Sequence, residues 1–165
     1  MKRENTRFLT EAAIIAAVYV VLTLVFAPIS YGEVQVRISE ALTILPFFTP
    51  AAVPGLFVGC LLANILGGAI LPDIIFGSLA TLIGAVFSRM LRKNRFLVPI
   101  PPIVSNTVIV PFVLRFGYGV NLPIPLMMLT VGIGEIISCG VLGLILLFAL
   151  EKSGAKRTLF GSSLT

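Results

Sequence analysis

A few charged side chains interrupt the apolar part of this sequence, and they are the residues that could bind a polar ligand there. Arg37 and Glu40 stand three residues apart, which puts both on one face of a helix. Turn formers precede them in residues 28–33, and prolines interrupt the apolar run behind them. The stretch therefore predicts a polar rim at the open end of a hydrophobic helix bundle.

The overall composition assigns the chain to the membrane. Of its 165 residues, 58% are hydrophobic and 12% are charged, whereas about 25% of residues are charged in a soluble domain. The net charge is +5, but the basic residues gather in short clusters beside apolar runs, without interleaved aromatic residues. That pattern indicates membrane orientation and not nucleic-acid binding. We therefore predict an all-α integral membrane protein that lies in a lipid bilayer and does not bind nucleic acid.

Six apolar segments are expected to form one bundle, which makes residues 1–165 a single domain. A span needs on the order of 20 residues, so the length leaves room for about six. The second span is short because Pro46 and Pro50 interrupt it. The predicted spans are residues 8–26, 36–48, 55–68, 73–90, 99–114 and 125–150.

The distribution of basic residues predicts the topology. With a cytoplasmic N-terminus and six spans, ten of the twelve basic residues fall on the cytoplasmic side, and only Arg37 and Arg115 fall outside. If residues 34–68 formed one span, the basic cluster of residues 89–95 would lie outside, against the positive-inside rule. Both termini are therefore predicted to be cytoplasmic in a multi-pass protein.

This topology places polar residues of five spans largely in the outer half of the membrane. Glu40, Asn64 and Asp73 come near the outer ends of their helices, and Asn106 lies near the middle of the fifth. Glu135 lies about ten residues into the sixth span, roughly 15 Å deep. A carboxylate at that depth costs about 2.5–3.5 kcal/mol. An outward-opening pocket would explain these positions.

Each candidate also has a purely structural interpretation. Glu135 could form an internal hydrogen bond, for example to Asn106, and the pair Arg37 and Glu40 could be a solvated helix end. The first span contains two overlapping pairs of small residues four apart, which allow a close helix approach in lipid. Those pairs could pack inside the bundle or bind a partner; their residues are Ala12, Ala13, Ala16 and Ala17.

The charges also predict the character of the ligand. Acidic residues outnumber basic ones in the outer half, and the chain has no histidine. A cation, or a neutral heterocycle with N–H donors, fits better than an anion. Tyr31 in the first outer loop could close over a flat ring, although interfacial aromatic residues often only anchor a helix.

Motifs for catalysis or metal binding are missing from the sequence. The two cysteines lack metal or redox spacing, and we find no phosphate loop, no nucleophile with a histidine base and no paired-acid motif of the prenyl-transfer kind. We therefore expect no enzymatic activity, no cofactor and no metal. A transporter of this size would need an energised partner or would run downhill.

Five segments, in order, resemble the successive motifs of the QueT family. They are VQVRISEAL at residues 34–42, ANILGG at 63–68, DIIFGSLATL at 73–82, SNTVIVP at 105–111 and GEIISC at 134–139. Together they cover most of residues 8–150. The last segment adds Ser138 to the candidate ligand-binding residues.

The resemblance implies a function. QueT proteins are substrate-binding (S) components of energy-coupling factor transporters, which are bacterial plasma-membrane ABC importers. S components are six-helix proteins that bind a vitamin-like compound from outside and dock through an alanine-rich first helix. The partner module has a transmembrane coupling subunit and two cytoplasmic ATPases. A loop over residues 28–36 would cover the ligand.

The substrate implied is a queuosine precursor, a 7-deazaguanine that carries an aminomethyl or cyano group. We hypothesise that Glu135 binds the guanine edge, that Asn106 reads the carbonyl, and that Glu40 or Asp73 binds the aminomethyl cation. Three alternatives stay open: an S component for another vitamin, a membrane enzyme, and a structural subunit without a ligand.

Overall fold

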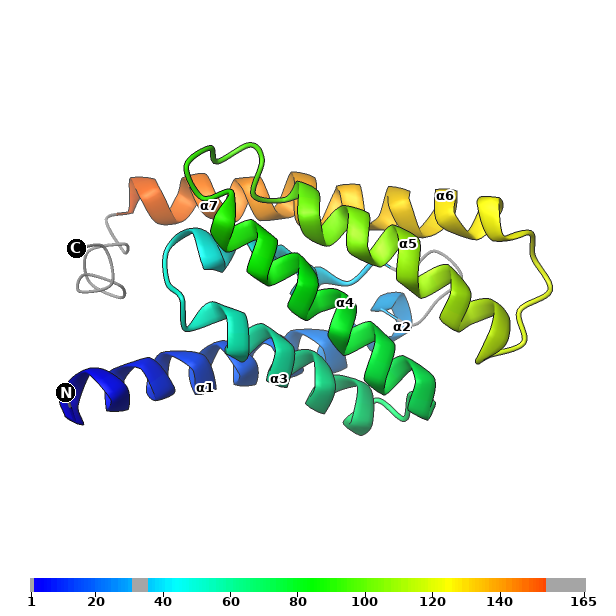
Figure 1. Ribbon diagram of the computed structural model, residues 1–165, viewed down its shortest axis with the longest axis horizontal. Coiled ribbons are helices and arrows are strands. Elements are labelled where there is room, and N and C mark those ends of the chain that lie inside the picture. The colour runs from blue at the N-terminus through cyan, green and yellow to red at the C-terminus, as the bar shows by residue number, and fades with distance from the viewer. Residues whose placement is uncertain (1, 31–35, 154–165) are drawn as a thin grey trace.

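The computed structural model describes residues 2–30 and 36–153, and in these ranges the regular elements are all helices (Figure 1). Six helical segments correspond to the six predicted ones. The first three are α1 (Lys2–Val25), η1 (Ile38–Phe47) and α3 (Ala52–Leu66), and a four-residue helix, α2 (Ala27–Ser30), follows α1. Next come α4 (Leu71–Met90), α5 (Ile100–Phe116) and a continuous rod made of α6 (Ile124–Glu135), η2 (Ile136–Leu142) and α7 (Gly143–Lys152).

Three of these segments are long and apolar enough to cross a membrane, by length and composition. They are Glu4–Val25, Leu71–Met90 and Ile124–Lys152, whereas Ile38–Phe47, Ala52–Leu66 and Ile100–Phe116 are shorter apolar helices. Many of their large hydrophobic side chains are exposed, for example Phe76, Phe112 and Ile145, which is typical of a lipid-facing surface.

The second segment is a 3₁₀ helix of ten residues, and it lies at the centre of the bundle. It contacts α1, α3, α4, η2 and α7, and its residues from Ser39 to Pro46 are buried. A 3₁₀ helix rises about 2.0 Å per residue, so ten residues reach about 20 Å, further than an α-helix of the same length. Irregular backbone at membrane depth is tolerated where protein surrounds it, and η1 meets that condition.

Small residues allow the helices around η1 to approach one another closely. A Cβ on Gly59 of α3 would lie 3.1 Å from the Cα of Ala16 in α1, and a Cβ on Gly84 of α4 would lie 2.7 Å from the Cα of Pro102 in α5. Gly143 likewise leaves room for Ile44 of η1. These contacts bring the helices near enough for side chains from all of them to meet around η1.

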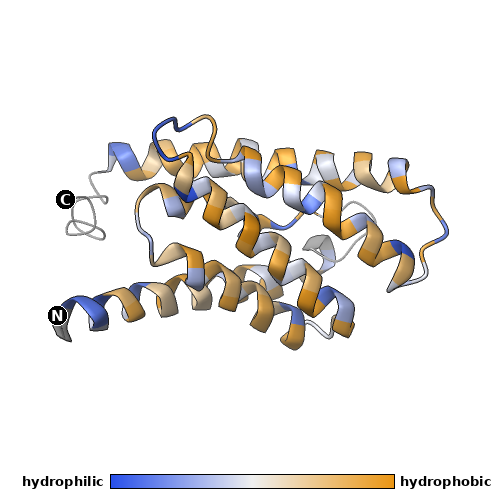
Figure 2. Ribbon diagram, in the orientation of Figure 1, coloured by the Kyte–Doolittle hydropathy of each residue, from blue (hydrophilic) through white to orange (hydrophobic). Residues whose placement is uncertain are grey.

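Polar and basic residues at several of the described helix ends lie together at one end of the bundle. Figure 2 shows hydrophilic residues at the start of α1, in the loop after α4 and at the end of α7, and Figure 1 places all three at the same end. Arg95 of this loop forms an ion pair with Glu151 of α7 at 3.1 Å. The tertiary structure therefore brings together the basic clusters that the sequence separates.

Candidate functional site

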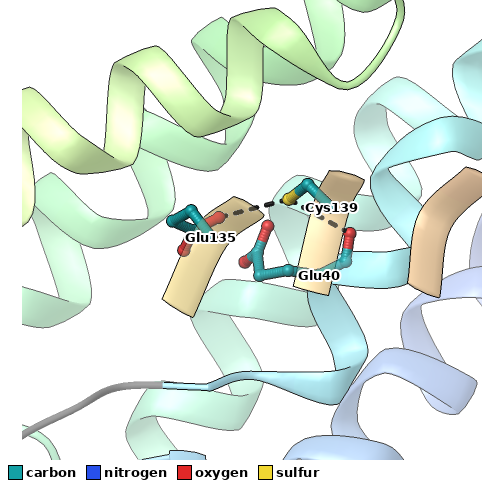
Figure 3. A group of neighbouring side chains, drawn as sticks. All are labelled: Glu40, Glu135 and Cys139. Carbon is teal, nitrogen blue, oxygen red and sulfur yellow. Dashed lines mark hydrogen bonds between the residues drawn. The ribbon is translucent and has the colours of Figure 1, made fainter. Parts of the chain in front are cut away.

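Two buried carboxylates and a thiol lie together beside η1 (Figure 3). Glu40 comes from the first turn of η1, Glu135 ends α6, and Cys139 lies in η2. One ligand atom of each residue lies within 4.8 Å of the others, and the two glutamates are 0% and 4% exposed. The Cys139 Sγ donates to Glu135 Oε2 at 3.1 Å. Ninety-five positions separate the two acids in the chain, yet they share one site.

The two oxygens of Glu40 have different surroundings. Its Oε1 accepts a hydrogen bond from the hydroxyl of Tyr19, which is itself buried in α1. Its Oε2 has no hydrogen-bond partner among the described residues, although it is shielded from solvent. A buried acceptor without a donor costs roughly 1–3 kcal/mol. This orphaned oxygen therefore marks a position where a ligand donor would be accommodated.

Two further polar side chains face the carboxylates. Asn106 of α5 lies close enough to interact with both Glu40 and Glu135, and Thr81 of α4 lies near Glu40. Both are buried. An amide offers two N–H donors and one acceptor, so Asn106 can read a ligand group of either kind beside the acids.

A second charged cluster joins η1 to α4. The Arg37 guanidinium lies 3.8 Å from Asp73 Oδ2, and both side chains are almost fully buried. The Tyr118 hydroxyl donates to the same Asp73 oxygen at 3.0 Å, and the Asn64 amide donates to the Asp73 carbonyl at 3.3 Å. Burial and the Asp73 charge raise the pKa of the Tyr118 hydroxyl above its ordinary value, so it remains a donor. Arg37 therefore already compensates Asp73.

Local sequence explains how these residues are positioned. Pro72 and Asp73 open α4, where a proline needs no N–H partner and an acid is favoured by the helix dipole. Gly77 stands one turn later, and a Cβ there would lie 2.8 Å from Asp73 Oδ1. The π-helical turn of η2 buries both Ser138 and Cys139; such turns are frequent at functional sites.

Comparison with known proteins assigns the family. A family model described as QueT transporter matches residues 9–152. The chain belongs to the QueT transporter family. A curated relative, the queuosine precursor transporter QueT of Lactococcus lactis subsp. cremoris (strain MG1363), is 38% identical over 85 residues, which are 50% of each chain. The matched part thus spans about half the length of this relative. No solved structure matches the chain significantly.

The residues predicted from sequence form two neighbouring groups in this QueT-family chain. Glu135, Asn106 and Glu40 make the first, and Arg37, Asp73 and Asn64 make the second. Ser138 is fully buried next to the first group, and its Oγ has no hydrogen-bond partner within the described ranges. Tyr31 lies outside the described residues, and so do residues 31–35 of the loop predicted to cover the ligand. The binding role of these side chains remains a prediction.

Sequence reasoning missed several polar groups of the candidate site. Tyr19 lies in the middle of an apolar helix, and Cys139 lacks metal or redox spacing, yet each forms a hydrogen bond to a glutamate. The hydroxyl of Tyr118, in the loop after α5, donates a hydrogen bond to Asp73. The sequence offered one weak indication of such groups, which is a polar side chain one helical turn from a candidate residue. Cys139, four residues after Glu135, is an example.

The four alanines of α1 divide between two surfaces. Ala16 is 7% exposed and packs on Gly59, and the backbone of Ala12 packs on Gly55 of α3. Ala13 and Ala17 are exposed, and with neighbouring residues such as Leu9 they line a shallow groove on the outer side of α1. Packing on α3 therefore accounts for the pair Ala12 and Ala16, and the pair Ala13 and Ala17 remains available to a partner.

Proposed function

We propose that this QueT-family protein is the substrate-binding membrane subunit of an energy-coupling factor importer, and that it captures a queuosine precursor, a 7-deazaguanine, from outside the cell. The observation that carries the proposal is the buried cluster of carboxylates, amide and hydroxyls around η1, inside a bundle whose exposed side chains are largely hydrophobic. Family membership and the name of the Lactococcus relative support the substrate class.

The chemistry of the cluster suits a 7-deazaguanine. Such a ring offers N1–H and an exocyclic amine as donors, and a carbonyl as acceptor. Carboxylates accept from N–H groups, and charge-assisted hydrogen bonds are roughly twice as strong as neutral ones. The Asn106 amide can donate to the carbonyl, as the sequence hypothesis has it. An anionic ligand would meet Glu40 and Glu135 at short range.

The proposed orientation has six spans and both termini in the cytoplasm. The end that carries Arg7, Arg89, Arg95 and Lys152 would then face the cytoplasm, in agreement with the positive-inside rule. The end that holds Tyr118 and the loop after α5 would face outward. Under this assignment Asp73 lies on the ligand's route to Glu135.

Delivery into the cytoplasm is proposed to require a partner module of one transmembrane coupling subunit and two ATPases. Because the family is one of transporters and not of enzymes, we assign no catalytic step to this chain. We assign docking to the side of α1 that faces away from the bundle, where Ala13 and Ala17 are exposed. Small side chains there allow another helix to approach closely in lipid.

Calorimetric titration of the purified, ligand-stripped protein in detergent tests the substrate. The ligands are 7-aminomethyl-7-deazaguanine, 7-cyano-7-deazaguanine, guanine, riboflavin and thiamine. We expect tight binding that is confined to the deazaguanines. Tight binding of riboflavin or thiamine would instead identify an S component for another vitamin, and absence of binding to all five would remove the substrate assignment.

A further inference from the structure

We infer that Glu40 and Glu135 together form a subsite for one primary ammonium group. This inference rests on the proposed function, and it specifies the substrate as the cationic, aminomethyl-bearing form of a deazaguanine. It also replaces the division of roles expected from the sequence, in which Glu135 binds the guanine edge and Glu40 or Asp73 binds the aminomethyl cation.

The separation of the two acids is the first argument. One carboxylate oxygen of each lies within 4.8 Å of the other, and Figure 3 shows the two carboxylates facing one another. A ring bound at both ends would need two hydrogen bonds of about 2.9 Å, and its own length, between the acids. A single nitrogen with charge-assisted bonds of about 2.8 Å bridges up to about 5.6 Å. The acids therefore converge on one group.

The second argument is the balance of charge. Among the described residues, the buried ion pair is Arg37 with Asp73, and no ion pair joins an arginine or lysine to Glu40 or Glu135, although Arg37 attracts both carboxylates from a greater distance. Two ionised carboxylates this close in a low-dielectric interior repel each other strongly, so one of them keeps its proton unless a cation lies between them. A ligand cation placed between them removes this repulsion, whereas a neutral ring edge does not.

The third argument is the orphaned acceptor. Glu40 is 0% exposed, and its Oε2 has no hydrogen-bond partner within the part of the chain that the structure describes. Tyr19 already occupies Oε1, and Cys139 occupies Glu135 Oε2. An ammonium carries three N–H donors, so it can satisfy Glu40 Oε2, reach Glu135 and keep one donor for Asn106.

A divalent metal is the competing occupant, because two carboxylates and a thiol can ligate zinc. The Cys139 thiol, however, donates a hydrogen bond to Glu135, and a thiol must lose its proton to bind a metal. The ammonium leaves this hydrogen bond intact. The arrangement of the site therefore favours the organic cation.

The test compares the aminomethyl and cyano deazaguanines on the wild type, Glu40→Gln, Glu135→Gln and the control Glu151→Gln. Glu151 lies on the same helical rod, in the surface ion pair with Arg95. Wild type is expected to prefer the aminomethyl compound. Each buried variant is expected to lose at least tenfold in affinity for it, and to bind the cyano compound within about threefold of wild type, because glutamine supplies an N–H that a nitrile accepts.

The ratio of the two affinities within one variant does not depend on the fraction of folded protein. If both ligands weaken by the same factor, the acids bind the ring and the inference is wrong, while the proposed function stands. The same holds if wild type prefers the cyano compound. Tight binding of Zn²⁺ alone that is lost in Cys139→Ser would also overturn the ammonium subsite. Absence of binding to either deazaguanine by wild type would refute the proposed function itself.

Discussion

Two neighbouring alanines of α1 allow the proposed docking surface to be separated from internal packing. The changes are Ala16→Leu and Ala17→Leu, which add the same side chain one residue apart. Ala16 is 7% exposed, and its Cα lies 3.1 Å from the position that a Cβ on Gly59 would take. Ala17 is exposed on the other side of the helix. Consecutive residues differ by about 100° around a helix, so the two variants probe different surfaces.

The contact distances give the expected magnitudes. Leucine at position 16 has no space against α3, and overpacking of this kind costs about 1–3 kcal/mol. For a chain of this size that lowers the melting temperature by about 2–12 °C. Leucine at position 17 meets no neighbour within the bundle, so stability is expected to stay within about 0.5 kcal/mol of wild type.

Three measurements on both variants complete the experiment: thermal unfolding in detergent, ligand binding by the isolated protein, and uptake into proteoliposomes that contain the energising module. We expect Ala17→Leu to unfold and bind like wild type but to lose uptake. Wild-type uptake by Ala17→Leu would refute docking through the exposed side of α1. A wild-type melting temperature for Ala16→Leu would refute the close packing of α1 on α3.

Two further substitutions test the bundle around the site. Asp73→Asn removes the carboxylate that forms the buried ion pair with Arg37; at 3.8 Å and an effective dielectric of about 20, the lost attraction is about 4 kcal/mol. Thermal unfolding is expected to show a loss of this size, and a shift below 1 °C would contradict it. Gly84→Ala places a Cβ 2.7 Å from the Pro102 backbone and is expected to cost about 1–3 kcal/mol. Gly132→Ala, whose nearest contact is 3.4 Å, is the control and is expected to match or exceed wild-type stability; equal melting temperatures for both glycine variants would be the contrary result.

The sequence by itself determined the class of the protein and most of its helical segments. Hydrophobic runs bounded by proline, glycine or basic clusters predicted six helices, and the structure has a helical segment in each place. The predicted starts and ends differ from the observed ones by a few residues, most at α1, which begins at Lys2 and not at residue 8. Residues 2–7 of α1 are polar, so hydropathy marks the edge of the apolar run and not the end of the helix.

The sequence also selected most of the site, because a charged or amide side chain inside an apolar helix is costly. That argument identified Glu40, Glu135 and Asn106 one at a time. It could not identify Tyr19, since a tyrosine among apolar residues is usual in a membrane helix, nor the pairing of Arg37 with Asp73 instead of Glu40.

Only the tertiary structure decided which of these groups meet. Glu40 and Glu135 converge because η1 is a stretched 3₁₀ helix held at the centre of the bundle, and because η2 widens the last helical rod beside it. The alanines of α1 separate into a pair that packs on α3 and an exposed pair because α3 brings Gly55 and Gly59 against one side. Periodicity gives the spacing of residues along a helix, whereas its rotation about its own axis is set by the side chains of the neighbours that pack against it.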